Sequence, residues 1–190
     1  MEQADLTRLH RWFSGYVATF ADLDPDGLRN IQLKEVHTAQ VVDCMRELAG
    51  GERLGEQESL LAEAVALLHD VGRFSQYRRW RTFRDSESDN HARLSLEVIR
   101  AEQVLAGLSD HEQLLIEEAV RFHNLLALPT TYASPTDLYI RLIRDADKLD
   151  IWRVFLEYYR QPEEQRASAV GLGFPDNPEI TGDCLDALAQ

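Results

Sequence analysis

The chain has little cysteine and no long apolar segment. Only two cysteines occur among its 190 residues, Cys44 and Cys184, which cannot form a disulfide framework and which fit a reducing compartment. No apolar run reaches the length that a membrane span needs, and the charged N-terminus lacks the apolar core of a signal peptide. These absences predict a cytoplasmic protein that does not enter a membrane.

Positive charge is also scarce. The 33 acidic residues outnumber the 20 basic ones, and the formal net charge is −13. Such a charge repels nucleic acids and anionic membranes, so the composition argues against general nucleic-acid binding. A phosphate-bearing ligand would need a local group of basic residues. With 44% hydrophobic residues the chain can build a full core, and we expect one domain over residues 1–190.

The hydrophobic periodicity predicts an all-α fold. Apolar residues recur every third or fourth position, and alternation with a period of two is missing. We expect about six to eight helices, the main ones over residues 4–22, 31–49, 57–72, 90–106, 110–123 and 134–160. The turn-rich residues 24–27 should separate the first two helices, and Gly72 should end the third. Residues 73–89 should be irregular after a short initial helix, and residues 161–190 should form a surface loop and a short C-terminal helix.

Several of these helices place a histidine or an aspartate on their apolar side. His37 and Asp147 lie in the middle of apolar faces, whereas Asp145 projects away and Asp150 lies at the edge, where it could support a ligand. Buried carboxylates need a cation, and neighbouring carboxylates repel each other. The pattern therefore predicts a centre for Fe, Mn, Ni, Co or Zn, or for Mg. The inward set comprises His37, His69, Asp70, His91, His123 and Asp147.

The arrangement of this set resembles the HD superfamily of metal-dependent phosphohydrolases. The resemblance rests on an isolated His37, the doublet His69-Asp70 in HDVGRF and Asp147 in ADKL, and it spans about residues 30–160. It implies an HD-type helical bundle in which these four residues bind metal. Members with two metal ions add two histidines, and His91 and His123 occupy such places, with Asp70 as the bridging carboxylate. In the alternative, a single ion is bound and these two histidines line the pocket.

The resemblance implies hydrolysis of a phosphate ester by a metal-activated water. Arginines are concentrated in GRFSQYRRWRTFR, directly after the doublet, and guanidinium groups match phosphate oxygens. We expect Asp70, Arg73 and Lys148 to be catalytic. The expected substrate is a small phosphorylated molecule such as a nucleotide, bound by Arg73, Lys148, Arg78 and Arg81.

Two motifs of known branches of the HD superfamily are missing here, which narrows the range of expected substrates. The acidic pair of alarmone hydrolases is replaced here by GRFSQYRRW, and the GYP segment of cyclic-dinucleotide phosphodiesterases by NLLALPTTY. Two other functions remain open, a diiron oxygenase with the same ligand types and a metal-binding regulatory domain without turnover. Aromatic residues such as Trp152 and Tyr159 would permit a homodimer.

Overall fold

The protein is an all-α domain, as its periodicity predicts. The computed structural model describes residues 1–128, 136–170, 182 and 186, which contain seven α-helices, two short 3-10 helices and no strand. None of the helices in these ranges is both long and apolar enough to cross a bilayer. The elements are α1 (Gln3–Ala18), α2 (Pro25–Gly51), α3 (Glu56–Leu68), α4 (Val71–Trp80), η1 (Asp85–Glu87), α5 (His91–Ala101), α6 (Asp110–Phe122), α7 (Thr136–Arg160) and η2 (Glu163–Gln165).

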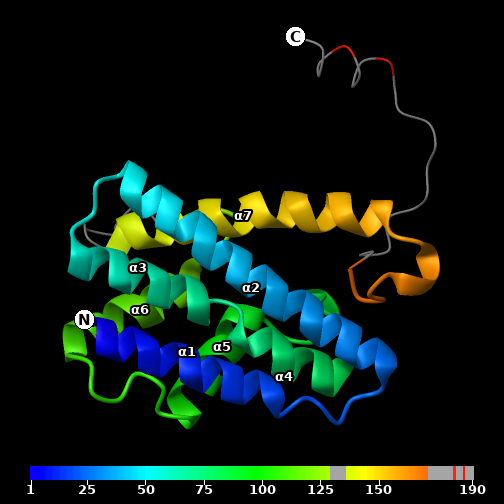
Figure 1. Cartoon of the computed structure of the whole chain (residues 1–190), viewed down its shortest axis with the longest axis horizontal. Helices are drawn as coiled ribbons and strands as arrows, with labels where there is room; N and C mark the ends of the chain where they lie inside the picture. Colours follow the sequence, from blue (N-terminus) through cyan, green and yellow to red (C-terminus); the bar gives the residue numbers. More distant parts are fainter. Residues whose placement is uncertain (129–135, 171–181, 183–185, 187–190) are drawn as a thin grey trace.

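Helix α3 is the centre of the bundle. Every residue from Leu60 to Leu68 is buried, because this stretch is apolar on all sides except at Glu63, whose carboxylate pairs with His10 and Arg46. Helices α1, α2, α6 and α7 pack around it, and α4 and α5 pack on each other beside α2 (Figure 1). The C-terminal end of α3, which carries the doublet, therefore lies inside the molecule.

Helix α2 begins earlier than the sequence predicts. Residues 24–27 do not form a separating turn, since Asp24 is the N-cap, its side chain accepts a hydrogen bond from Gly27 N (2.8 Å), and Pro25 occupies the first turn. Proline and aspartate are typical of helix starts as well as of turns. The added first turn lies against the end of α4, where Tyr77 Oη donates to Asp26 Oδ2 (3.0 Å) and Arg81 pairs with Asp24.

The expected helix over residues 57–72 is divided in two. Helix α3 ends at Leu68 and α4 begins at Val71, and Gly72 lies inside α4 without a positive φ. The prediction that Gly72 ends a helix is therefore wrong. Its missing side chain has another role, because a Cβ there would lie 2.3 Å from Ser95 N and 2.6 Å from Leu94 C on α5. Glycine is needed for the close approach of α4 and α5.

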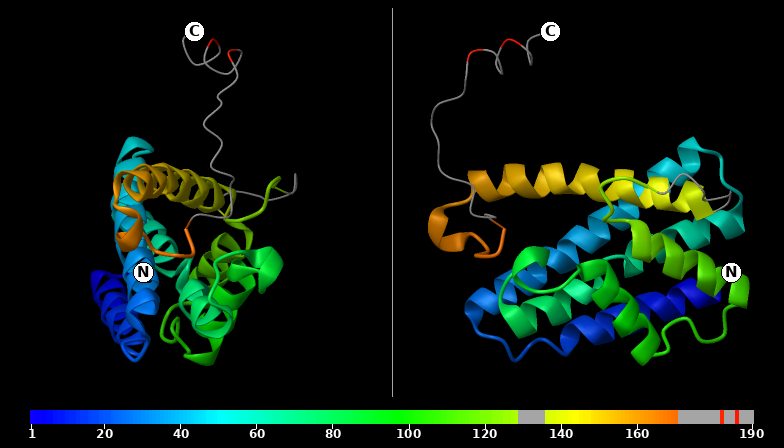
Figure 2. Two further views of the ribbon diagram at one scale, coloured as in Figure 1. Left: turned by 90° about the vertical axis from the view of Figure 1, so that its right-hand side faces the viewer. Right: turned by 180° about the vertical axis from the view of Figure 1, so that it is seen from behind.

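Helix α7 lies along the outer edge of the bundle in all three views (Figures 1 and 2). It packs on α2, α6 and α3, and after it the chain returns to α2, where Ser168 Oγ donates to Asp26 Oδ2 (2.6 Å) and Ala169 N donates to Asn30 Oδ1 (3.1 Å). Most of the expected C-terminal loop and short helix lies outside the described residues.

Candidate metal centre

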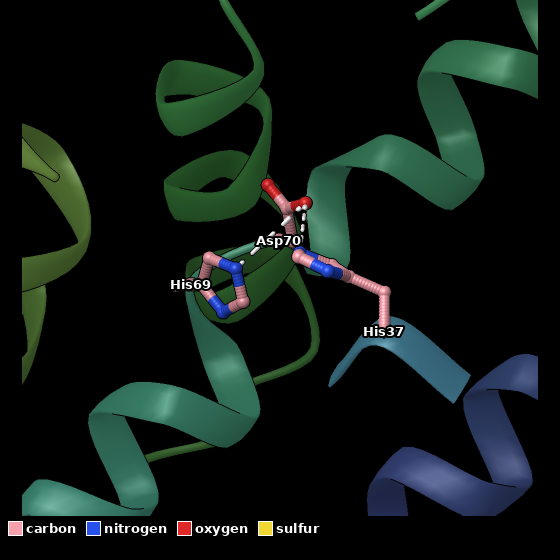
Figure 3. A group of neighbouring side chains, drawn as sticks. All are labelled: His37, His69 and Asp70. Carbon is pink, nitrogen blue, oxygen red and sulfur yellow. Dashed lines mark ion pairs between the residues drawn. The ribbon is translucent and has the colours of Figure 1, made fainter. Parts of the chain in front are cut away.

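The first group of candidate ligands forms where α3 is followed by α4. His69 and Asp70 are the two residues between these helices, and α2 and α7 bring His37 and Asp147 to the same point. His37 Nε2 lies 3.6 Å from Asp70 Oδ2 and 3.1 Å from Asp147 Oδ1. His69 Nε2 lies 3.8 Å and 3.7 Å from the same two atoms. Figure 3 shows both imidazoles directed at the Asp70 carboxylate.

A second group lies at the other oxygen of Asp70. His91 is the first residue of α5, and His123 directly follows α6. Their Nε2 atoms lie 3.7 and 3.8 Å from Asp70 Oδ1. Each Asp70 oxygen thus faces its own pair of histidines, and in each group of three residues the ligand atoms lie within 4.8 Å of one another.

In all four histidines Nδ1 lies at a hydrogen-bond acceptor and Nε2 faces the centre. His69 Nδ1 donates to Ala66 O and His123 Nδ1 donates to Val120 O, both at 2.7 Å, and a carbonyl can only accept. The Nδ1 atoms of His37 and His91 lie 2.6 Å from carboxylate oxygens of Asp150 and Asp85. Fixing the proton on Nδ1 leaves the Nε2 lone pair free to bind a metal.

The polar atoms left unpaired fit a divalent cation. His37 Nε2, His69 Nε2 and Asp70 Oδ1 are buried without a hydrogen-bond partner, and an unmet buried acceptor costs about 1–3 kcal/mol. The Nε2 atoms of His91 and His123 face each other at 3.1 Å, close enough to bind one ion together. Imidazole nitrogens and carboxylate oxygens are ligands of divalent transition metals, so the donor set fits such ions.

Comparison with known families identifies the fold. A family model described as "HD domain" matches residues 35–152, which is more than half of the chain. The chain belongs to the HD domain family. This confirms the family that the sequence motif resembles and places the protein in a superfamily of metal-dependent phosphohydrolases. No match was found among curated proteins or among solved structures.

The HD doublet carries a strongly stabilised negative charge. Burial raises the pKa of Asp70, but Lys34, His69 and Arg73 outweigh burial and hold the pKa well below its usual value. Lys34 Nζ lies 2.8 Å from Oδ2, and Arg73 Nε lies 3.5 Å from Oδ1. The pKa of Asp147 is likewise held well below its usual value against the effect of burial, because the imidazoles of His37 and His69 lie 3.1 and 3.7 Å from its Oδ1.

The carboxylates of Asp85 and Asp150, which contact Nδ1 of His91 and His37, are ionised. Burial raises the pKa of Asp85, but the hydrogen bond from His91 and the charge of Arg73 lower it to about 2. The pKa of Asp150 is lowered by His37 and Arg153 against burial. His91 stays neutral at physiological pH because burial and the charge of Arg73 lower its pKa to about 4. A neutral imidazole is the form that binds metal.

The structure separates the four basic residues expected to contact substrate. Arg73 lies beside Asp70 and is fixed by Phe83 O and Asp85 Oδ1. Lys148 is exposed one residue after Asp147. Arg78 pairs with Asp22 and Arg81 with Asp24, so these two arginines hold α4 to the segment before α2 instead of pointing to the centre. The prediction that they bind substrate is not supported by these contacts.

Two residues near the centre escaped the sequence reasoning. Lys34 precedes His37 by three positions, which places it one helical turn away, and this spacing could have been noticed. Asp85 contacts His91 from the start of η1, a 3-10 helix that the sequence does not predict. The aspartates of α7 lie as expected, because Asp145 is exposed and Asp150 is buried against His37.

Proposed function

We propose that this HD domain hydrolyses a small phosphate ester such as a nucleotide, with two divalent ions that share Asp70. The observation that carries the proposal is the position of Asp70 between two histidine pairs, one at each carboxylate oxygen. His37, His69 and Asp147 would complete one ion site, and His91 and His123 the other. Asp85 and Asp150 would orient the ligands that they contact.

The bound ions and the protein chain would contribute differently to hydrolysis. When bound, divalent ions lower the pKa of a water molecule and offset the charge on phosphoryl oxygens. The chain supplies the ligands with their protons already fixed on Nδ1, so little reorganisation is needed when an ion binds. It also excludes bulk water, because Asp70 and the four histidines are buried.

Positive charge for the substrate comes from three residues around the centre. Lys34 and Arg73 flank Asp70, and Lys148 follows Asp147. Arg73 is held by Gln76, Phe83 and Asp85, so its guanidinium is positioned before a substrate arrives. These cations supply the local positive charge that a phosphate needs in a chain with a net charge of −13.

Metal content tests the two-ion centre. The protein is purified without a His tag or chelator and measured by plasma mass spectrometry, beside His91→Ala. We expect about two equivalents in the wild type and about one in the variant, since removing one of the few protein ligands typically empties a site. Asp147→Ala and Asp145→Ala form a matched pair on one helix, and only the first should lose metal. One equivalent that is unchanged by His91→Ala would overturn the two-ion proposal.

Activity is measured separately on the loaded protein. Release of inorganic phosphate is followed with a panel of nucleoside mono- and triphosphates, with Asp70→Asn as the inactive control. Hydrolysis by the wild type and its loss in the control are expected. A fully loaded protein that hydrolyses no ester would overturn the proposed reaction, and dioxygen consumption by an iron-loaded sample would replace it with oxygenase chemistry.

A further inference from the structure

The C-terminal half of α7 carries an exposed apolar stripe. The stripe consists of Leu149, Trp152, Leu156 and Tyr159, whose exposed fractions are 55%, 72%, 56% and 60%. Their spacing of three, four and three residues places them on one face of the helix, as in the seam of a coiled coil. Monomeric proteins rarely leave such a continuous row of large apolar side chains exposed.

The stripe faces away from the rest of the domain. The same half of α7 turns Val154 and Tyr158 toward α2, where they line a cavity of about 260 Å³ together with Leu33 and Val36. Figures 1 and 2 show that α7 forms the outer edge of the bundle. No element of the described part of the chain covers the stripe.

We infer that the stripe binds the same stripe of a second copy of this chain, which gives a two-fold symmetric dimer. A stripe with this spacing packs best against another helix whose apolar residues also recur at alternating intervals of three and four. Helix α7 of a second copy is such a helix. In a symmetric pair each row of large side chains packs into the spaces of the other.

Charge favours a second copy over a partner of opposite charge. Helix α7 contains as many basic as acidic residues, so the rest of the chain carries the whole net charge of −13. Two copies of an acidic protein repel each other least where the surface is electroneutral. A basic partner would instead be attracted to the acidic surfaces outside α7.

The area is sufficient for a weak to moderate dimer. From the exposed fractions, the four side chains offer about 450 Å² per copy. A pair would bury about 900 Å² from the stripes alone, close to the ~1,000 Å² expected of a specific interface. Helix α7 also carries Asp147 and Asp150 on its inner side, so pairing would brace the helix that supplies a candidate ligand.

Sedimentation of the full chain tests the dimer. At about 100 µM, where even a micromolar dimer is populated, we expect a mass twice the 21.8 kDa of one chain. Trp152→Glu and Leu156→Glu should each weaken association by about 30-fold or more. Leu114→Glu on α6, where the leucine is 58% exposed, is the matched control and should remain dimeric.

The outcomes are independent of the hydrolysis proposal. Circular dichroism and metal content should be unchanged in all three variants, because the substituted side chains are exposed and lie outside the metal centre. A wild type that stays monomeric at the highest concentration would overturn the inference. A dimer that survives both stripe variants would overturn the assignment of this surface.

Discussion

Adding a single methyl group at Gly72 should measurably lower the free energy of unfolding. In Gly72→Ala the added Cβ would lie 2.3 Å from Ser95 N, 2.6 Å from Leu94 C and 2.7 Å from His91 O. All three are backbone atoms of α5 or its start, so no side-chain rotation can relieve the contacts. Helices α4 and α5 must therefore move apart.

The cost can be worked out from the contacts. Overpacking of this kind costs about 1–3 kcal/mol, and weakening the 2.9 Å hydrogen bond from Gly72 N to Ser95 Oγ adds about 1 kcal/mol. The higher helix propensity of alanine returns about 1 kcal/mol. The net loss in the free energy of unfolding should be about 1–3 kcal/mol, or a fall in Tm of about 2–12 °C.

Urea and thermal unfolding of the metal-free protein measure this loss. Gly15→Ala is the control, because Gly15 lies exposed within α1 with no atom within 4 Å of the added Cβ, and it should stabilise the protein by up to ~1 kcal/mol. The displacement of α5 also moves His91, so Gly72→Ala should retain less metal. If both variants gained stability equally, the close approach of α4 and α5 would be refuted.

Two further predictions concern the outer partners of the histidines and the effect of pH. Asp150→Ala removes the acceptor of His37 Nδ1 and should weaken metal binding about 10–100-fold in a competition titration. The control Glu157→Ala removes the other partner of Arg153 and should leave metal binding unchanged. Equal losses of affinity in the two variants would mean that Arg153, and not the contact with His37, is responsible. In the metal-free protein the pKa of His91 is lowered to about 4, below its value of about 6.5 in the unfolded chain. The unfolded chain therefore binds this proton first, and as pH falls from about 6.5 to about 4 the free energy of unfolding should drop by about 3 kcal/mol on account of His91. Urea midpoints of the wild type and His91→Gln across this range should diverge, and parallel curves would contradict the assignment.

The sequence alone determined the helical class and most of the inward-facing ligand set. Both follow from local rules, because a period of 3.6 residues decides which side chains share a face. For this reason His37 and Asp147 could be recognised as inward and Asp145 as outward, and the HD motif could be recognised without a structure. The helix start at Pro25 was missed, since proline and aspartate serve turns and helix caps alike.

Only the tertiary structure decided how these residues meet. The break between α3 and α4, the need for glycine at position 72 and the two-sided environment of Asp70 all depend on α5, α6 and α7 packing beside the doublet. The same is true of the arginines, because whether a guanidinium reaches the centre or an aspartate before α2 depends on contacts distant in sequence. Periodicity specifies the face of a helix, but the neighbour of that face is chosen by the packing of the whole chain.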